Sequence, residues 1–141
     1  MSVYSNILVC TDFTDNSVKA VKKAAEVASS SGASLTVLHV VTYVPPAYTG
    51  VEIPAKYASV DYLRERAEQH LGLWCNENVN MDYEQLVRTG NAKSVIHDVA
   101  LEQKADLLVI GAAGESGLIR VFGSIAGYVV QHAECDVLVV K

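Results

Sequence analysis

Residues 105–124 read ADLLVIGAAGESGLIRVFGS, and this stretch decides the fold. The run at 106–110 turns apolar after Asp106, which is typical of a strand covered on both faces, as in a parallel sheet. Glycines follow at positions 111, 114 and 117, and Gly123-Ser124 opens a helical pattern that reaches His132. A glycine loop between a strand and a helix N-terminus presents backbone N–H groups, so the stretch predicts a phosphate site. The alternative is a tight strand-to-helix connection without a ligand.

The bulk composition indicates one globular domain over residues 1–141. Of the 141 residues, 50% are hydrophobic and 19% are charged, which suits a single buried core. No apolar run approaches the ~20 residues that span a bilayer, and the N-terminus lacks a signal-peptide pattern, so we expect a cytoplasmic protein without a membrane partner. The net charge of −5 argues against nucleic acid as a partner. Three scattered cysteines indicate free thiols rather than a disulfide framework.

Strand and helix patterns alternate along the chain. Strand patterns lie at residues 6–10, 34–41, 83–88, 106–110 and 136–140, and helix patterns at 15–29, 60–76, 94–104 and 123–132. This alternation predicts a five-stranded parallel α/β sheet with helices on both faces and right-handed crossovers. Ligands of such sheets bind at the carboxyl ends of the strands, where the strand order reverses. If the first and fourth strands are neighbours, the polar turn at 11–17 and the glycine loop face one crevice.

The connection at residues 42–58 is long and carries three prolines and three tyrosines. Long loops in compact domains are often lids or contact surfaces, and the alternative is a variable surface excursion.

Better-known glycine and catalytic motifs fit less well. A P-loop would need a Gly-Lys-Ser/Thr ending, but no lysine lies between Ala105 and Val140. The run Gly114-Glu115-Ser116-Gly117 lacks the Gly-x-Ser-x-Gly spacing of a serine hydrolase, and the four histidines lack partners at metal-ligand spacing. For phosphoryl transfer, the loop offers Arg120 as its only cation. We therefore expect no catalytic residues, no metal-ligating residues and no enzyme activity.

The chain resembles the universal stress protein family of the UspA-like type over essentially its whole length. The resemblance is carried by several segments together: NILVCTD at 6–12, LHV at 38–40, Gly90-Asn91, the run from Asp106 into the glycine loop, and AECDVLVV at 133–140.

This resemblance implies an adenine nucleotide alpha hydrolase-like fold with strand order 3-2-1-4-5 and homodimers paired along the last strand. In one branch of the family it also implies ATP, with or without magnesium, at the ends of the first and fourth strands. Asp12 would meet the ribose, the backbone of Val40 would meet adenine, and glycines with Ser124 would line the phosphates. The predicted site residues are Thr11, Asp12, Val40, Gly111, Gly114, Gly123 and Ser124.

One spacing departs from the ATP-binding branch, whose pattern is Gly-x2-Gly-x9-Gly-Ser/Thr. Gly114 and Gly123 enclose eight residues here, and Glu115 adds a negative charge. The loop could absorb the missing residue, or Gly123-Ser124 could lie away from the outer phosphates. Two functions stay open at this point: a regulatory protein that binds ATP or ADP, and a dimeric interaction protein of the stress response that binds no nucleotide.

Overall fold

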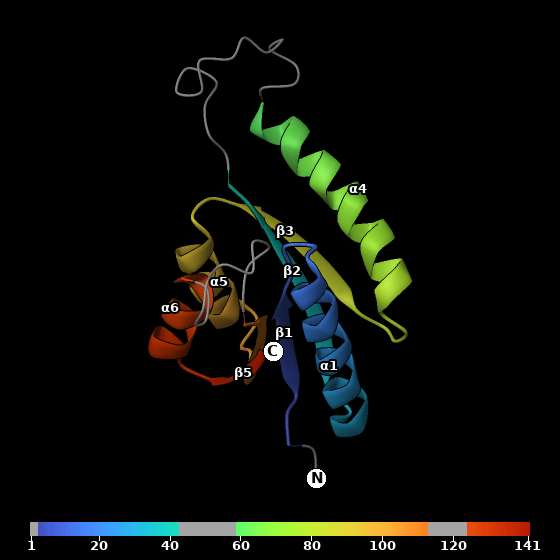
Figure 1. The fold of residues 1–141 in the computed structure, drawn as a ribbon, viewed down its shortest axis with the longest axis vertical. Coiled ribbons are helices and arrows are strands. Elements are labelled where there is room, and N and C mark those ends of the chain that lie inside the picture. Colours follow the sequence, from blue (N-terminus) through green and yellow to red (C-terminus); the bar gives the residue numbers. More distant parts are fainter. Residues whose placement is uncertain (1–2, 43–58, 113–123) are drawn as a thin grey trace.

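The structure, a computed structural model, describes residues 3–42, 59–112 and 124–141. Its five strands are β1 (Asn6–Cys10), β2 (Ser34–Val41), β3 (Glu84–Thr89), β4 (Leu107–Gly111) and β5 (Asp136–Val140). They form one sheet in the order β3-β2-β1-β4-β5, and each neighbouring pair is parallel. The predicted strand order is therefore confirmed, and β1 lies at the centre of the sheet (Figure 1).

Helices cover both faces of the sheet, as predicted. They are α1 (Asp15–Ser31), α4 (Val60–Asn78), α5 (Ala92–Glu102) and α6 (Ser124–His132). The side chains of β1 alternate between the two layers: Ile7 and Val9 pack with α1 and α4, whereas Leu8 and Cys10 pack with α5 and α6. Both faces of β1 are buried, which explains why residues 6–10 read as a continuous apolar run.

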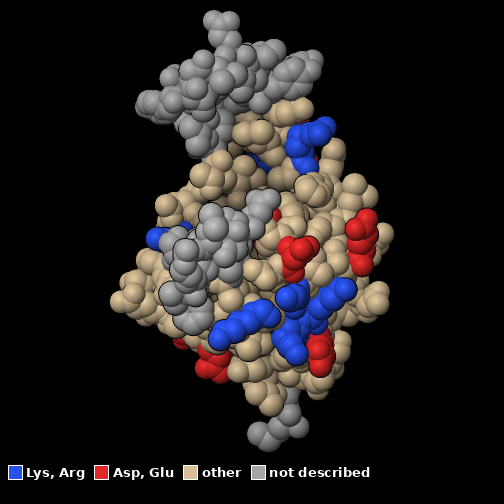
Figure 2. All heavy atoms as spheres, in the orientation of Figure 1, with Lys and Arg blue, Asp and Glu red and all other residues tan. Residues whose placement is uncertain are grey.

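Helix α1 lies close to the sheet because its inner face carries small residues. Ala20, Ala24 and Ala28 are completely buried, and Gly32 ends the helix in a left-handed conformation with φ of 68°. Figure 2 shows basic side chains gathered over α1, which has exposed lysines at positions 19, 22 and 23. Lys23 lies 3.8 Å from the carboxylate of Glu26. The outer face of α1 is thus a charged face that contacts solvent.

Helix α4 is buried only in its second half. Its buried residues are Leu71, Trp74 and Cys75, while its first half extends past the sheet in Figure 1. None of the helices in the described ranges is long and apolar enough to cross a membrane.

The three cysteines carry free thiols, as predicted. Burial raises the pKa of the Cys10 thiol to about 12 and that of Cys75 to about 11.

Some predicted element boundaries were wrong by one or two residues. Helix α5 begins at Ala92 rather than at 94 because Asn91 caps it, its side-chain oxygen accepting from the N–H groups of Lys93 and Ser94. Asp106 precedes β4 instead of starting it. Its carboxylate accepts hydrogen bonds from the backbone N–H groups of Ser5 (2.8 Å) and Asn6 (2.9 Å). Asp106 therefore joins the beginnings of β1 and β4.

Candidate functional site

The turn after β1 and the connection after β4 leave the sheet at the same edge. β1 and β4 are parallel neighbours, with Ile7 opposite Leu107 and Val9 opposite Val109. β4 ends at Gly111 and α6 begins at Ser124, so the predicted glycine loop joins these two elements. The turn and the glycine loop thus both follow strands that end at the carboxyl edge, where the strand order reverses around β1.

Thr11 anchors the turn after β1 to the second strand. Its backbone N–H donates to the carbonyl oxygen of Leu38 (2.9 Å), and its own carbonyl oxygen accepts from Nδ1 of His39 (2.8 Å). The Thr11 side chain is buried, and its hydroxyl oxygen accepts from the N–H of Phe13 (3.0 Å). Thr11 is therefore a supporting residue that holds the turn, and it lies next to the predicted ribose contact.

Asp12 is exposed and is held by the first turn of α1. Its Oδ1 accepts hydrogen bonds from the hydroxyls of Thr14 and Ser17 and from the N–H of Thr14 (3.1 Å). Partial burial acts to raise the pKa of Asp12, but the hydrogen bonds from Ser17 and Thr14 outweigh it and leave the pKa below its usual value. The carboxylate is therefore ionised at neutral pH. These bonds all use Oδ1, so Oδ2 is the oxygen that the network leaves for a ligand.

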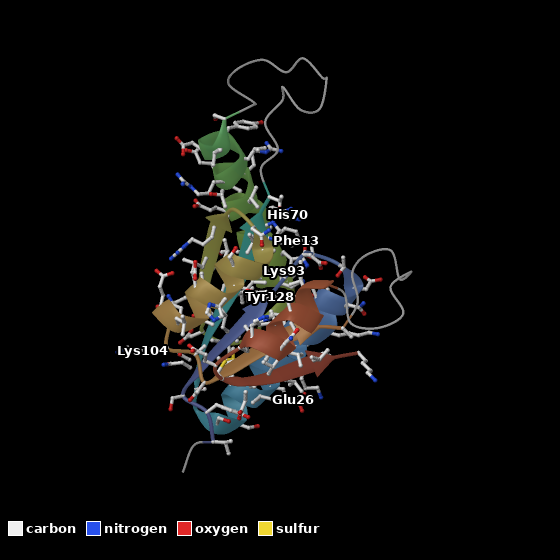
Figure 3. The ribbon with its side chains drawn as sticks, turned by 90° about the vertical axis from the view of Figure 1, so that its left-hand side faces the viewer. Phe13, Glu26, His70, Lys93, Lys104 and Tyr128 are labelled. Atoms are coloured by element: carbon white, nitrogen blue, oxygen red, sulfur yellow. The ribbon has the colours of Figure 1, made fainter. Side chains whose placement is uncertain are left out.

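Phe13 lies at the centre of an aromatic cluster that sequence reasoning missed. Its backbone is left-handed, with φ of 67°, an uncommon conformation for a residue other than glycine. Its ring stacks on His70 with centroids 4.1 Å apart, lies 4.4 Å from His39 and meets Trp74 edge-on at 5.7 Å. Figure 3 shows Phe13 and His70 lying together. The cluster therefore joins the turn after β1 to α4 and to the end of β2.

The backbone of Val40 lies at the carboxyl edge of the sheet, where β1 has already ended. The carbonyl of Leu38 faces β1, because it accepts from Thr11, whereas the carbonyl of Val41 faces β3 and accepts from Gly90 (3.0 Å). Backbone groups alternate along a strand, so the N–H and C=O of Val40 point to the same side as those of Leu38. β1 has already ended at Cys10, opposite Leu38. The Val40 backbone thus faces the space above the end of β1.

Gly111 lies against the first turn of α1. A Cβ at this position would be 3.2 Å from both the Cβ and the carbonyl oxygen of Asn16. This close approach of β4 to α1 is a packing reason for glycine at position 111, in addition to any contact with a ligand. Of the other predicted phosphate residues, Gly114 and Gly123 lie outside the described residues, and Ser124 is the first residue of α6, as predicted.

The arrangement is suited to binding a polar ligand. It combines the ionised carboxylate of Asp12, the backbone of Val40, for which the structure records no hydrogen-bond partner among the described residues, and a helix that begins where the glycine loop ends. In the described ranges, no group of three or more histidine, cysteine, aspartate or glutamate residues could hold a metal ion.

Comparison with known proteins gives a consistent result. The model of the universal stress protein family matches residues 4–141. The chain is similar to universal stress protein A homolog 1 of Coxiella burnetii, with 33% identity over 97% of this chain and 96% of that protein.

Solved structures of universal stress proteins also resemble this chain over nearly its whole length. A universal stress protein in complex with cAMP has a TM-score of 0.67 and 29% identity, covering 99% of this chain and 98% of its own. The universal stress protein of Archaeoglobus fulgidus in complex with dAMP has a TM-score of 0.63 and 26% identity, covering 99% of each chain. The chain therefore belongs to the universal stress protein family.

Proposed function

We propose that this protein is a cytoplasmic regulatory protein of the stress response that binds an adenine nucleotide at the carboxyl edge of β1, β2 and β4. The observation that carries the proposal is the Asp12 carboxylate, which is exposed, has a lowered pKa and is held through one oxygen by Thr14 and Ser17. Because Oδ1 holds the side chain in place, Oδ2 can accept a hydrogen bond from a ribose hydroxyl without a large loss of side-chain entropy.

The groups around Asp12 suit the other parts of a nucleotide. The N–H and C=O of Val40 offer one donor and one acceptor, which match the edge of adenine. The N-terminus of α6, which begins at Ser124, favours phosphate through its free N–H groups and its dipole. In this proposal the glycines at 111, 114 and 123 let the phosphates approach the backbone.

The relatives support an adenine nucleotide rather than another ligand. One related structure contains cAMP and another contains dAMP, two ligands that both carry adenine and one phosphate. In this proposal adenine meets the Val40 backbone, and Asp12 meets the free sugar hydroxyl, which is the 2′-OH in cAMP and the 3′-OH in dAMP. We propose ATP or ADP as the ligand in the cell, with magnesium bound through the phosphates, and binding without turnover.

The test is calorimetry and thermal melting with ATP, ADP, AMP and cAMP, each with and without magnesium. For a dissociation constant near 1 μM and about 1 mM nucleotide, linkage predicts about 4 kcal/mol of stabilisation. Asp12→Ala should weaken binding at least tenfold. Asp15→Ala is the matched control, because it removes the same charge from an exposed residue of the same turn. The absence of heat and of a melting shift with every nucleotide would refute the proposal and leave a dimeric interaction protein.

A further inference from the structure

A cavity lies toward the amino ends of the strands, away from the proposed nucleotide site at the carboxyl edge. It has a volume of about 260 Å³ and lies between α5 and α6, close to the residues that precede β4 and β5. Figure 3 shows this face, with Tyr128 of α6 next to α5 and Lys104 at the far end of α5. The proposed nucleotide site is at the carboxyl edge, so the two sites share none of the residues named for either.

The floor of the cavity is apolar. Ile96 of α5, Leu108 of β4 and Val129 of α6 line it, and each of them is almost completely buried. Leu101 also lines the cavity, although its side chain remains 50% exposed. A pre-formed cavity with an apolar floor is suited to an apolar group.

The polar lining residues include one cation, Lys104. Lys104, His97 and His132 contribute to the lining, and Glu134 is the only carboxylate among the described residues there. Lys104 is exposed, and within the ranges that the structure covers its ammonium forms no recorded ion pair. An anion placed beside Lys104 would therefore not need to displace a partner that the structure records.

His132 is oriented by its own helix. Its Nδ1 lies 3.0 Å from the carbonyl oxygen of Tyr128, which can only accept, so Nδ1 carries a proton. The imidazole also stacks on the Tyr128 ring at 4.1 Å. These two contacts fix the ring and leave Nε2 as the nitrogen that can contact a ligand.

We propose that this cavity binds a small carboxylic acid with an unbranched apolar tail. The tail would lie between α5 and α6 on Ile96, Leu108 and Val129, and the carboxylate would pair with Lys104. The volume of about 260 Å³ is below the roughly 300–1,000 Å³ of pockets for drug-sized ligands, which restricts the ligand to a short chain. Octanoate is a suitable probe.

The first test measures the affinity of a chain-length series, from butanoate to decanoate, by calorimetry. Each added methylene should tighten binding about threefold to fourfold until the cavity is full. Octanol should bind at least tenfold more weakly than octanoate, because it lacks the charge that pairs with Lys104. Equal affinity for octanol and octanoate, or no dependence on chain length, would overturn the proposal.

Cys135 provides an independent readout, because it lines the cavity while Cys10 and Cys75 are buried. Octanoate should slow the alkylation of Cys135 at least fivefold at saturation, whereas unchanged alkylation would contradict binding at this site. Lys104→Met should lower octanoate affinity about tenfold. Lys93→Met is the matched control, because Lys93 lies near Tyr128 but does not line the cavity. Equal losses in the two variants would also contradict the proposal.

Discussion

Phe13 combines an unfavourable backbone with favourable side-chain contacts. The left-handed conformation costs roughly 1–2 kcal/mol for a residue with a Cβ. The stacked contacts with His70 and His39 and the edge contact with Trp74 offset this cost. Phe13 is therefore kept in this conformation by its neighbours and not by local preference.

This balance predicts an unusual order of stability for two variants. Phe13→Ala should lower the free energy of unfolding by about 1–3 kcal/mol, since it removes the ring contacts and keeps the unfavourable backbone conformation. Phe13→Gly loses the same contacts but relieves the backbone, so it should be about 1 kcal/mol more stable than Phe13→Ala. Urea unfolding of both variants measures the difference. A glycine variant that is less stable than the alanine variant would show that the turn imposes no strain.

At the scale of helices and strands, Gly111 in β4 and Gly127 in α6 differ in how closely other atoms surround them. A Cβ at Gly111 would meet the backbone and Cβ of Asn16 at 3.2 to 3.3 Å, whereas a Cβ at Gly127 within α6 would meet nothing within 4 Å. Gly111 therefore sets how closely β4 and α1 pack, while Gly127 only weakens its helix.

Alanine substitutions should have opposite effects at these two positions. Gly111→Ala should lower the free energy of unfolding by about 1 kcal/mol or more, because α1 must move away from β4. Gly127→Ala should raise it by about 0.5–1 kcal/mol through helix propensity. Thermal melting of the two variants side by side checks both signs. A stabilising Gly111→Ala would mean that the contact with Asn16 relaxes without cost.

The elements were largely predictable from local sequence, and the errors have physical causes. Residues 6–10 were predicted with their observed bounds, because this strand is buried on both faces and its apolar run is continuous. The bounds of 34–41 were also predicted, although Ser34, Thr36 and His39 lie among its apolar residues. Helix α5 begins two residues before its predicted start, because the Asn91 side chain caps it and the apolar pattern that guided the prediction begins only at Val95.

The site was predictable only in part. The apolar pattern indicated where β1 and β2 end, whereas the choice of Asp12 and Val40 at those ends came from the family resemblance. Phe13 gave no such signal, since its partners His39 and Trp74 are distant in sequence and come together only in the fold. The same holds for Gly111, whose packing against Asn16 joins elements far apart in the chain.

At the scale of the whole molecule, β5 is one edge strand of the described sheet, and β3 is the other. Within the described sheet β5 pairs only with β4, and four of its five residues are partly buried. The carbonyl of Val140 accepts from Ala112, so Val140 and, by alternation, Leu138 direct their backbone groups to β4. The backbone of Val139 points outward, and an unpaired edge of this kind favours pairing with a second copy.

We expect a homodimer paired along β5, and proline substitutions can test it. Val139→Pro removes an outward N–H and should give a folded monomer. Leu138→Pro is the contrasting variant, because it removes an N–H that faces β4 and should destabilise the fold itself. Light scattering at tens of micromolar, with circular dichroism of each variant, separates the two effects. A wild-type monomer under these conditions would rule out the dimer.

The central position of β1 has a consequence for synthesis in the cell. β1 is made early, but its neighbour β4 and the Asp106 carboxylate that binds Asn6 lie 100 residues later in the chain. At a translation rate of about 5–20 residues per second, one side of β1 waits roughly 5–20 s for its partner. During that interval the apolar strand at the centre of the future sheet is open on one edge, and an unpaired apolar strand favours association with other chains.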